Sequence, residues 1–180
     1  MMMPPDHDAP EEIAWQGDWI TAKTRGRWEY VSRAKGIRAA VILPIDHDHV
    51  ILVEQYRIPL SSRCLELPAG LVGDGSDNDG ESADTAATRE LEEETGYHAD
   101  HWENCGEFFS SPGMVSESFT LLKATGLTKV SEGGGIDGEN ITVHRVPLAN
   151  IRSFIAEQRK AGIAIDVKLL LLLGADLLAE

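Results

Sequence analysis

The sequence is poor in positive charge and lacks long apolar runs. Its 16 Lys and Arg are outnumbered by 30 Asp and Glu, which gives a formal net charge of −14 at pH 7. Nucleic acids and anionic membranes repel so acidic a protein, and we therefore expect neither as a partner. The most apolar stretch, residues 167–173, is interrupted by Lys168 and followed by Gly174. It is far too short to span a bilayer.

Cysteine is also scarce, since only Cys64 and Cys105 are present. Two cysteines cannot form the dense disulfide framework of a small secreted protein. The sequence shows no signal peptide, so we expect free thiols and a cytoplasmic location.

The remaining composition is that of one soluble globular domain. Apolar residues make up 42% and charged residues 26% of the 180 residues, a length that buries about 70% of the unfolded surface. We expect a tail at residues 1–12, an N-terminal antiparallel β region at 13–36 and the main domain at 37–180. Strands and helices interleave in the main domain, which predicts an α/β protein with an α/β/α sandwich on a mixed sheet.

Hydrophobic periodicity and turn residues set the expected elements of the main domain. The glycine-rich acidic stretch at residues 130–140 predicts a mobile lid. Strands are expected at residues 37–45, 50–57, 63–68, 102–109, 117–124 and 141–146, and helices at residues 82–95, 148–159 and 164–178.

Aromatic residues form a strand-like series near the N-terminus, with a turn at Arg25-Gly26. A short hairpin does not need so many for its own stability. They could pack on the core, form a stacking platform for a purine, or make a dimer contact. The series comprises Trp15, Trp19, Trp28 and Tyr30.

The run Asp46-His47-Asp48-His49 contains residue types that bind metals. It lies between two predicted strands, and Asp and His tolerate turn geometry. We therefore predict a hairpin turn here in preference to a metal site.

The most informative stretch is a predicted helix that carries four glutamates within five positions. At 100° per residue, Glu90, Glu93 and Glu94 share one face, while Glu92 points away. An apolar stripe for docking on a sheet is formed by Ala83, Ala87 and Leu91.

The three carboxylates on one face destabilise each other. Two unit charges about 5 Å apart repel by roughly 3 kcal/mol at an effective dielectric near 20. Arg89 can pair with Glu93 at i+4, which relieves part of this repulsion. Raised pKa values or hard divalent cations such as Mg²⁺ or Mn²⁺ could relieve the rest. A solvated acidic face is the alternative for such a run taken alone.

The run is part of a longer pattern: Glu81, seven residues, then Arg89-Glu90-Leu91-x-Glu93-Glu94-x-Gly96-Tyr97. This pattern resembles the signature box of the Nudix hydrolases, G-x5-E-x7-R-E-U-x-E-E-x-G-U, where U is bulky and apolar. Gly75 has the literal spacing for the opening glycine. We prefer Gly70, because Leu67-Pro68-Ala69-Gly70 resembles the LPAG strand end of ADP-ribose-type members, and the following loop is then about five residues longer.

Other segments resemble the ADP-ribose and ADP-sugar pyrophosphatases of this family. Pro112 follows Gly96 by 16 positions, as in those enzymes. Further similar segments are Ser111-Pro112-Gly113 with Glu117, residues 27–33 around Trp28 and Arg33, Gln55-Tyr56-Arg57, and residues 138–143.

The resemblance implies specific roles in metal binding. Glu90, Glu93 and Glu94 would bind Mg²⁺, or Mn²⁺ as a substitute, through their side chains. Ala69 would bind it through its carbonyl. Arg89 would orient the glutamates, and Glu81 would steady the loop of the box.

It also implies roles in catalysis and substrate binding. Glu139 would be the general base or a further metal ligand, with Asp137 and Glu117 as rivals. Arg57 and Arg33 would hold phosphates. Trp28 would stack on adenine, often across a homodimer interface, and the remaining substrate contacts would come from Pro112, Gly113 and Glu117.

The reaction that the resemblance implies is Mg²⁺-dependent hydrolysis of the pyrophosphate bond of ADP-ribose, or of a related ADP-sugar, to AMP and ribose 5-phosphate; the substrate is a small-molecule nucleotide sugar. A family member that cleaves another substrate, such as GDP-mannose, is the first alternative. A non-catalytic, nucleotide-binding regulatory module is the second. Its usual mark is a degraded box, whereas this box keeps its glutamates and arginine.

Overall fold

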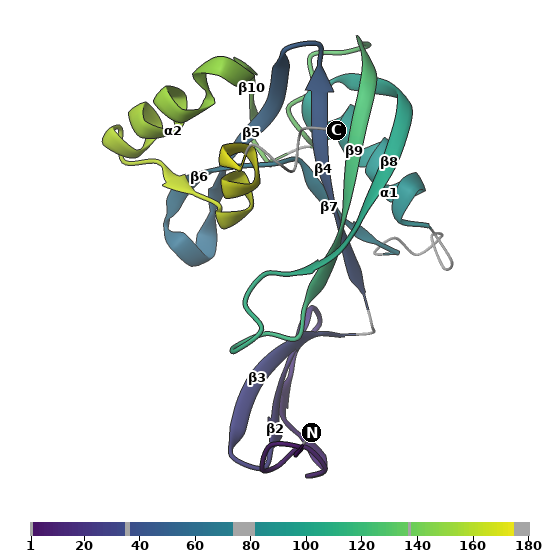
Figure 1. The fold of residues 1–180 in the computed structure, drawn as a ribbon, viewed down its shortest axis with the longest axis vertical. Coiled ribbons are helices and arrows are strands. Elements are labelled where there is room, and N and C mark those ends of the chain that lie inside the picture. Colours follow the sequence, from purple (N-terminus) through teal and green to yellow (C-terminus); the bar gives the residue numbers. More distant parts are fainter. Residues whose placement is uncertain (1, 35–36, 74–81, 137, 175–180) are drawn as a thin grey trace.

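The computed structural model describes residues 2–34, 37–73, 82–136 and 138–174. The chain forms two sheets, a small one at the N-terminus and a large mixed one (Figure 1). None of the helices in these ranges is long and apolar enough to cross a membrane. Cys64 and Cys105 are free thiols, as expected.

The small sheet is antiparallel, in the order β1-β2-β3. It lies apart from the main body, beside the loop before β9 (Figure 1). Val31 N–H donates to the Met114 carbonyl at 3.0 Å, and Ser116 N–H donates to the Val31 carbonyl at 2.9 Å. The strands of the small sheet are β1 (Glu11–Gln16), β2 (Ile20–Arg25) and β3 (Trp28–Arg33).

The N-terminal boundary differs from the expected one. Residues 11 and 12, assigned to a tail, belong to β1. Asp6 also forms an ion pair with Arg27 at 2.8 Å. Backbone pairing of β1 with β2, and the ion pair of Asp6 with Arg27, therefore join part of the expected tail to the small sheet.

The large sheet has the order β11-β6-β5-β4-β9-β8, with β10 on β5 and β7 on β4. The pair β4–β9 is parallel, and β4–β5, β5–β6 and β8–β9 are antiparallel, so the sheet is mixed as expected. Its strands are β4 (Arg38–Asp46), β5 (His49–Arg57), β6 (Ser62–Glu66), β7 (Ala69–Val72), β8 (Tyr97–Phe109), β9 (Ser118–Lys129), β10 (Thr142–Pro147) and β11 (Ala164–Ile165).

Alternating side chains of the central strands build a core on each face of the large sheet. Val41 and Leu43 of β4 pack on the side of α2 (Ile151–Lys160). Ala40 and Ile42 pack on the side of α1 (Ala83–Glu90). Helices therefore cover both faces, and the predicted α/β/α sandwich is confirmed (Figure 1).

The turn and the loop that the sequence predicts are present. Residues 46–49 connect β4 to β5, and His47 adopts a left-handed conformation with φ 55°. The hairpin prediction is confirmed. The described residues between β9 and β10 form no strand or helix.

The expected helix at residues 164–178 is wrong over its described part. Ala164 and Ile165 pair in parallel with β6, and a short 3-10 helix follows at Val167–Leu173. Asp166 separates the two, because its side chain accepts a hydrogen bond from Lys168 N–H at 2.7 Å. Residues 175–178 lie outside the described ranges.

Candidate functional site

The acidic helix begins with a side-chain cap and ends with a widened turn. The Ser82 hydroxyl accepts a hydrogen bond from Thr85 N–H, which satisfies one free donor of the first turn. After α1 the chain continues as a π-helix, Leu91–Thr95, and ends at Gly96 with φ 74°. Single π turns of this kind often occur at functional sites. The term acidic helix denotes residues 83–95 below.

Small and apolar residues hold the acidic helix close to the sheet. Ala87 and Leu91 are fully buried against Ala40 and Ile42 of β4, and Ala83 packs at the edge of this cluster. The predicted docking stripe is therefore confirmed. Glu90 and Glu94, which lie beside this stripe, reach β7: Gly70 lies against Glu90, and Ala69 N–H donates to Glu94.

Arg89 pairs with two of the predicted metal ligands. Its Nη1 atom lies 2.9 Å from Glu90 Oε1 and 3.2 Å from Glu93 Oε2. The i+4 pair with Glu93 is the predicted one. Arg89 thus holds the two carboxylates side by side.

Glu94 is the buried member of the acidic cluster, with only 5% of its surface exposed. Burial, followed by the charge of Glu90, raises the pKa of Glu94 to about 8. Ala69 N–H donates to Glu94 Oε2 at 3.1 Å and lowers the pKa in part. The charge of Glu139 also raises it, which places Glu139 within electrostatic range of Glu94.

Gly70 lies directly against Glu90. A Cβ atom built at Gly70 would overlap the side chain of Glu90, so any other residue here would displace Glu90. This contact supports Gly70 as the box glycine. Gly75, the other candidate, and Glu81 lie outside the described residues.

These residues suit a hard divalent cation. Oxygen ligands without histidine are those that Mg²⁺ prefers. Burial, and then the charge of Glu90, raise the pKa of Glu94, and a bound cation would favour its charged form. In the described ranges, no three acidic, histidine or cysteine side chains already form a metal-binding group.

The glycine-rich loop brings Glu139 to the acidic helix. Gly134 N–H donates to the Glu94 carbonyl and Gly135 N–H to the Glu93 carbonyl, both at 2.9 Å. The Glu139 side chain accepts from Ile136 N–H at 2.9 Å. Asp137, a rival for the base, lies outside the described residues.

Both predicted phosphate-binding arginines are ion-paired. Arg57 makes a bidentate pair with Glu66, at 2.7 Å from each guanidinium nitrogen, and this bond raises the pKa of Arg57. Arg33 Nε lies 2.5 Å from Glu117 Oε1. Glu117, the other rival for the base, is therefore tied to Arg33. Sequence reasoning missed Glu66, although its place two residues before Pro68 was a usable signal.

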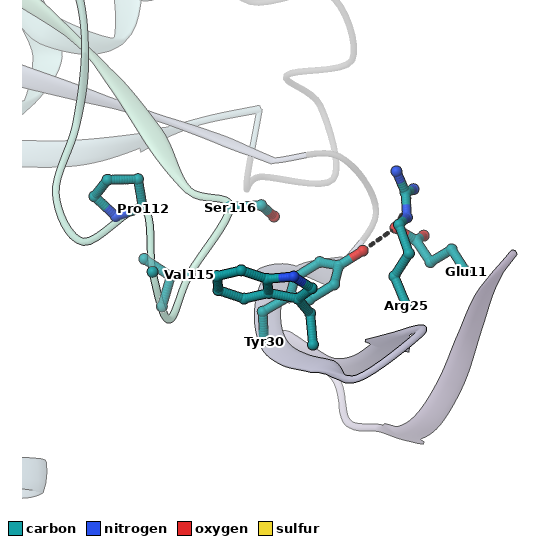
Figure 2. A pocket seen from close by; sticks show the side chains of 8 residues that line it. Glu11, Arg25, Tyr30, Pro112, Val115 and Ser116 are labelled. Atoms are coloured by element: carbon teal, nitrogen blue, oxygen red, sulfur yellow. Dashed lines mark hydrogen bonds and ion pairs between the residues drawn. The ribbon is translucent and has the colours of Figure 1, made fainter. Parts of the chain in front are cut away.

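Trp28 lies in a cavity of about 460 Å³ between β3 and the loop after β8. Pro112 and Gly113, predicted with it, line the same cavity. Figure 2 shows Pro112 and Val115 on one side and Glu11 and Arg25 on the other. An apolar cavity with a polar edge suits a planar base.

The polar edge of this cavity was not predicted. The carboxylate of Glu11 binds Tyr30 Oη and lies 3.2 Å from Arg25 (Figure 2). The hydrogen bonds from Lys23 and Tyr30 lower the pKa of Glu11 to about 2. Glu11 was assigned to a tail, and only the pairing of β1 with β2 brings it here.

The N-terminal tryptophans do not pack on the core. Trp15, Trp19 and Trp28 expose 57%, 56% and 56% of their surface. The interpretation that they are core residues is therefore wrong. The other two interpretations of these tryptophans, a stacking platform for a purine and a contact with a second copy, stay predictions.

A model of the NUDIX domain family matches residues 35–163. One curated relative and one solved structure that are similar to this chain carry names of enzymes acting on ADP compounds. The ADP-sugar pyrophosphatase of Mus musculus is 38% identical over 134 residues, 64% of this chain and 59% of the relative. A crystal structure titled ADP compounds hydrolase has a TM-score of 0.69 and 25% identity and covers 91% of this chain and 89% of its own.

Two further relatives carry other names. The methanol dehydrogenase activator of Bacillus methanolicus is 36% identical over 121 residues, 67% of this chain and 63% of the relative. The GDP-mannose pyrophosphatase of Cronobacter sakazakii is 30% identical over 158 residues, 83% of this chain and 76% of the relative. The chain spans less than two thirds of the length of the activator and of the mouse enzyme.

Proposed function

Because the chain belongs to the NUDIX domain family, we propose that it hydrolyses the pyrophosphate bond of ADP-ribose, or of a related ADP-sugar, to AMP and ribose 5-phosphate. The observation that carries this proposal is the buried carboxylate of Glu94 beside Glu90 and Glu93 on the acidic helix. Burying one carboxylate beside two others is unfavourable, and a bound cation with its diphosphate would offset this cost.

Glu90, Glu93 and Glu94 would hold the cation through their side chains, with the Ala69 carbonyl as a backbone ligand. When bound, Mg²⁺ or Mn²⁺ supplies screening of the diphosphate charge and a more acidic water. Arg89 keeps Glu90 and Glu93 in place. Ala69 N–H orients Glu94 by donating a hydrogen bond to its Oε2 atom.

Glu139 is proposed as the general base. It sits on a loop whose backbone binds the carbonyls of Glu93 and Glu94, so it belongs to the same assembly as the ligands. A carboxylate there can take a proton from an attacking water. The alternative role for Glu139 is that of a further metal ligand.

The substrate-binding residues divide into two groups. Trp28, Pro112 and Gly113 line one cavity and would bind the adenine. Arg57 and Arg33 would bind phosphates, each from an ion pair that preorganises it, with Glu117 as the partner of Arg33.

We also propose a homodimer that forms through the small sheet. Ile13 exposes 61% of its surface there, in addition to the three tryptophans. Exposed apolar groups gathered on one sheet indicate a protein–protein contact. The two free thiols agree with a cytoplasmic enzyme.

A substrate panel tests the proposed reaction. With Mg²⁺ present, the protein should release AMP from ADP-ribose faster than it cleaves GDP-mannose, NADH or a dinucleoside polyphosphate. Products are separated by ion-exchange chromatography, and EDTA gives the metal-free control. The similarity to a GDP-mannose pyrophosphatase makes GDP-mannose the decisive competitor. If it turns over best, the ADP-ribose assignment is wrong.

A further inference from the structure

The loop after β9 is bound to the carboxyl end of the acidic helix by its backbone. Val130 N–H and Ser131 N–H donate to the Gly96 carbonyl at 2.8 Å and 3.1 Å. Gly134 N–H and Gly135 N–H then donate to the Glu94 and Glu93 carbonyls. Carbonyls in the last turn of a helix lack donors within the helix, and the loop supplies them.

This docking requires a position without a side chain. A Cβ atom at Gly133 would lie 2.6 Å from Gly96 N and 2.8 Å from the Glu94 carbonyl oxygen. Both are backbone atoms, which cannot turn aside as the end of a long side chain can. Gly133 also has φ 66°, a left-handed conformation that disfavours other residues.

The docked segment continues into a closed loop that carries Glu139. Ile141 N–H donates to the Gly134 carbonyl at 3.2 Å and closes the loop. Inside it, Glu139 N–H donates to the Ile136 carbonyl at 3.1 Å. A Cβ atom at Gly135 would overlap the Glu139 carboxylate, so the side chain of Glu139 lies over Gly135.

We propose that Gly133 is a positioning residue, which lets residues 133–135 lock onto the acidic helix and thereby fixes Glu139 relative to the carboxylates of Glu93 and Glu94. This inference rests on the proposed function, in which Glu139 is the base. Glu93 and Glu94 then have two tasks: their side chains bind the cation, and their carbonyls hold the loop that brings the base.

The inference revises the expectation of a mobile lid. Glycines commonly indicate flexibility, but residues 133–135 have positive φ values that only glycine adopts easily. Gly134 and Gly135 N–H donate to the acidic helix, and Gly133 N–H donates to the Ser131 hydroxyl. The glycine-rich start of the loop is therefore fixed to the acidic helix by its backbone hydrogen bonds.

Gly133→Ala tests the docking directly. In the metal-free protein, hydrogen exchange measured by NMR should show the amides of Gly134 and Gly135 losing protection by about tenfold or more. With ADP-ribose, kcat should fall on the order of 100-fold, because a displacement of about 1 Å is enough for such a loss. KM should change little, since the loop does not line the adenine cavity.

Gly162→Ala is the matched control. Gly162 also has a positive φ, of 86°, but no atom lies within 4 Å of an added Cβ. The Gly162→Ala variant should leave kcat and the hydrogen-exchange protection of the Gly134 and Gly135 amides unchanged.

A double mutant separates positioning from general loss of structure. If Gly133 acts through Glu139, then Gly133→Ala combined with Glu139→Gln should lower kcat about as much as Glu139→Gln alone. Losses that multiply, or unchanged protection of the two amides in Gly133→Ala, would overturn the inference. A wild-type protein that leaves ADP-ribose intact would instead overturn the proposed function, and the exchange data would still decide whether residues 133–135 are docked.

Discussion

At the scale of single residues, Glu94 dominates the electrostatics of the site. Its carboxyl group is almost inaccessible to water, and burial raises its pKa to about 8. A raised pKa means that the folded protein binds this proton more tightly than the unfolded chain does. The carboxyl group therefore favours folding below the ordinary pKa of 4.5, and this contribution is lost as the pH rises through about 8.

The first prediction follows from this linkage. In EDTA, the free energy of unfolding of the wild type should fall by up to a few kcal/mol between about pH 5 and about pH 9. Glu94→Gln should show a smaller fall, because glutamine does not ionise. Urea denaturation at both pH values measures the difference. Identical pH dependence in the two proteins would show that Glu94 is not the titrating group.

The second prediction concerns the same side chain in catalysis. Glu94→Gln should lower kcat for ADP-ribose by roughly 10³-fold or more, because metal-ion catalysis contributes several kcal/mol. Circular dichroism should show an intact fold. Glu92→Gln is the control, because Glu92 pairs with His98 on another side of the helix. A Glu94→Gln protein with normal kcat would remove Glu94 from the proposed ligands.

The third prediction concerns Trp28. Trp28→Ala should raise KM for ADP-ribose roughly tenfold, because stacking on a base contributes about 1–3 kcal/mol. The value of kcat should stay nearly constant, and Trp28→Phe should recover most of the affinity. Steady-state kinetics measures KM and kcat of both variants. An unchanged KM in Trp28→Ala would show that the Trp28 cavity does not bind the base.

At the scale of elements, the acidic helix depends on its close contact with β7. The overlap of a Cβ atom at Gly70 with the Glu90 side chain gives the fourth prediction. Gly70→Ala should displace Glu90 and weaken Mn²⁺ binding, and overpacking should cost about 1–3 kcal/mol in stability. Isothermal titration calorimetry and urea denaturation measure the two effects.

Gly174→Ala is the control for Gly70→Ala. An added Cβ at Gly174 would meet only the Leu171 carbonyl, at 3.8 Å. Gly174→Ala should therefore keep wild-type Mn²⁺ affinity. Equal affinities in Gly70→Ala and wild type would contradict the proposed role of Glu90.

The elements show how far a sequence can be interpreted. The acidic helix was predictable because Ala87 and Leu91 repeat at helical spacing and Glu90 and Glu93 follow the same period. The π turn was not, because it depends on how residues 91–95 meet the loop. The run after Ile163 was misassigned because an apolar stretch suits a helix or a strand, and only contact with β6 decides.

The candidate site also has one part that the sequence predicts and another that it does not. The proposed metal ligands Glu90, Glu93 and Glu94 lie within one helix, so local periodicity predicts that they meet. The pairing of Arg57 with Glu66 and the docking of the Glu139 loop on the acidic helix depend on contacts between separate segments, which no local pattern encodes. Glu66 reaches Arg57 only because β5 pairs with β6.

At the scale of the whole molecule, the small sheet is the surface through which we propose that two copies meet. The fifth prediction is that the protein sediments as a dimer, with about twice the monomer mass of 19.7 kDa. Ile13→Ser combined with Trp15→Ser should shift it to monomer, because both side chains are exposed apolar groups of β1.

The control for this variant removes exposed apolar groups elsewhere. Met2→Ser combined with Met3→Ser alters residues that expose 94% and 61% of their surface but belong to no strand. It should remain a dimer. A wild type that sediments as a monomer at all concentrations would contradict the dimer.

The hydrogen bonds from Gly134 and Gly135 to the acidic helix also limit how this protein can be re-engineered. A chimera that takes the loop alone from a relative would keep the proposed ligands of the acidic helix but lose the register between helix and loop. Helix and loop should therefore be exchanged together, as one transferable cassette.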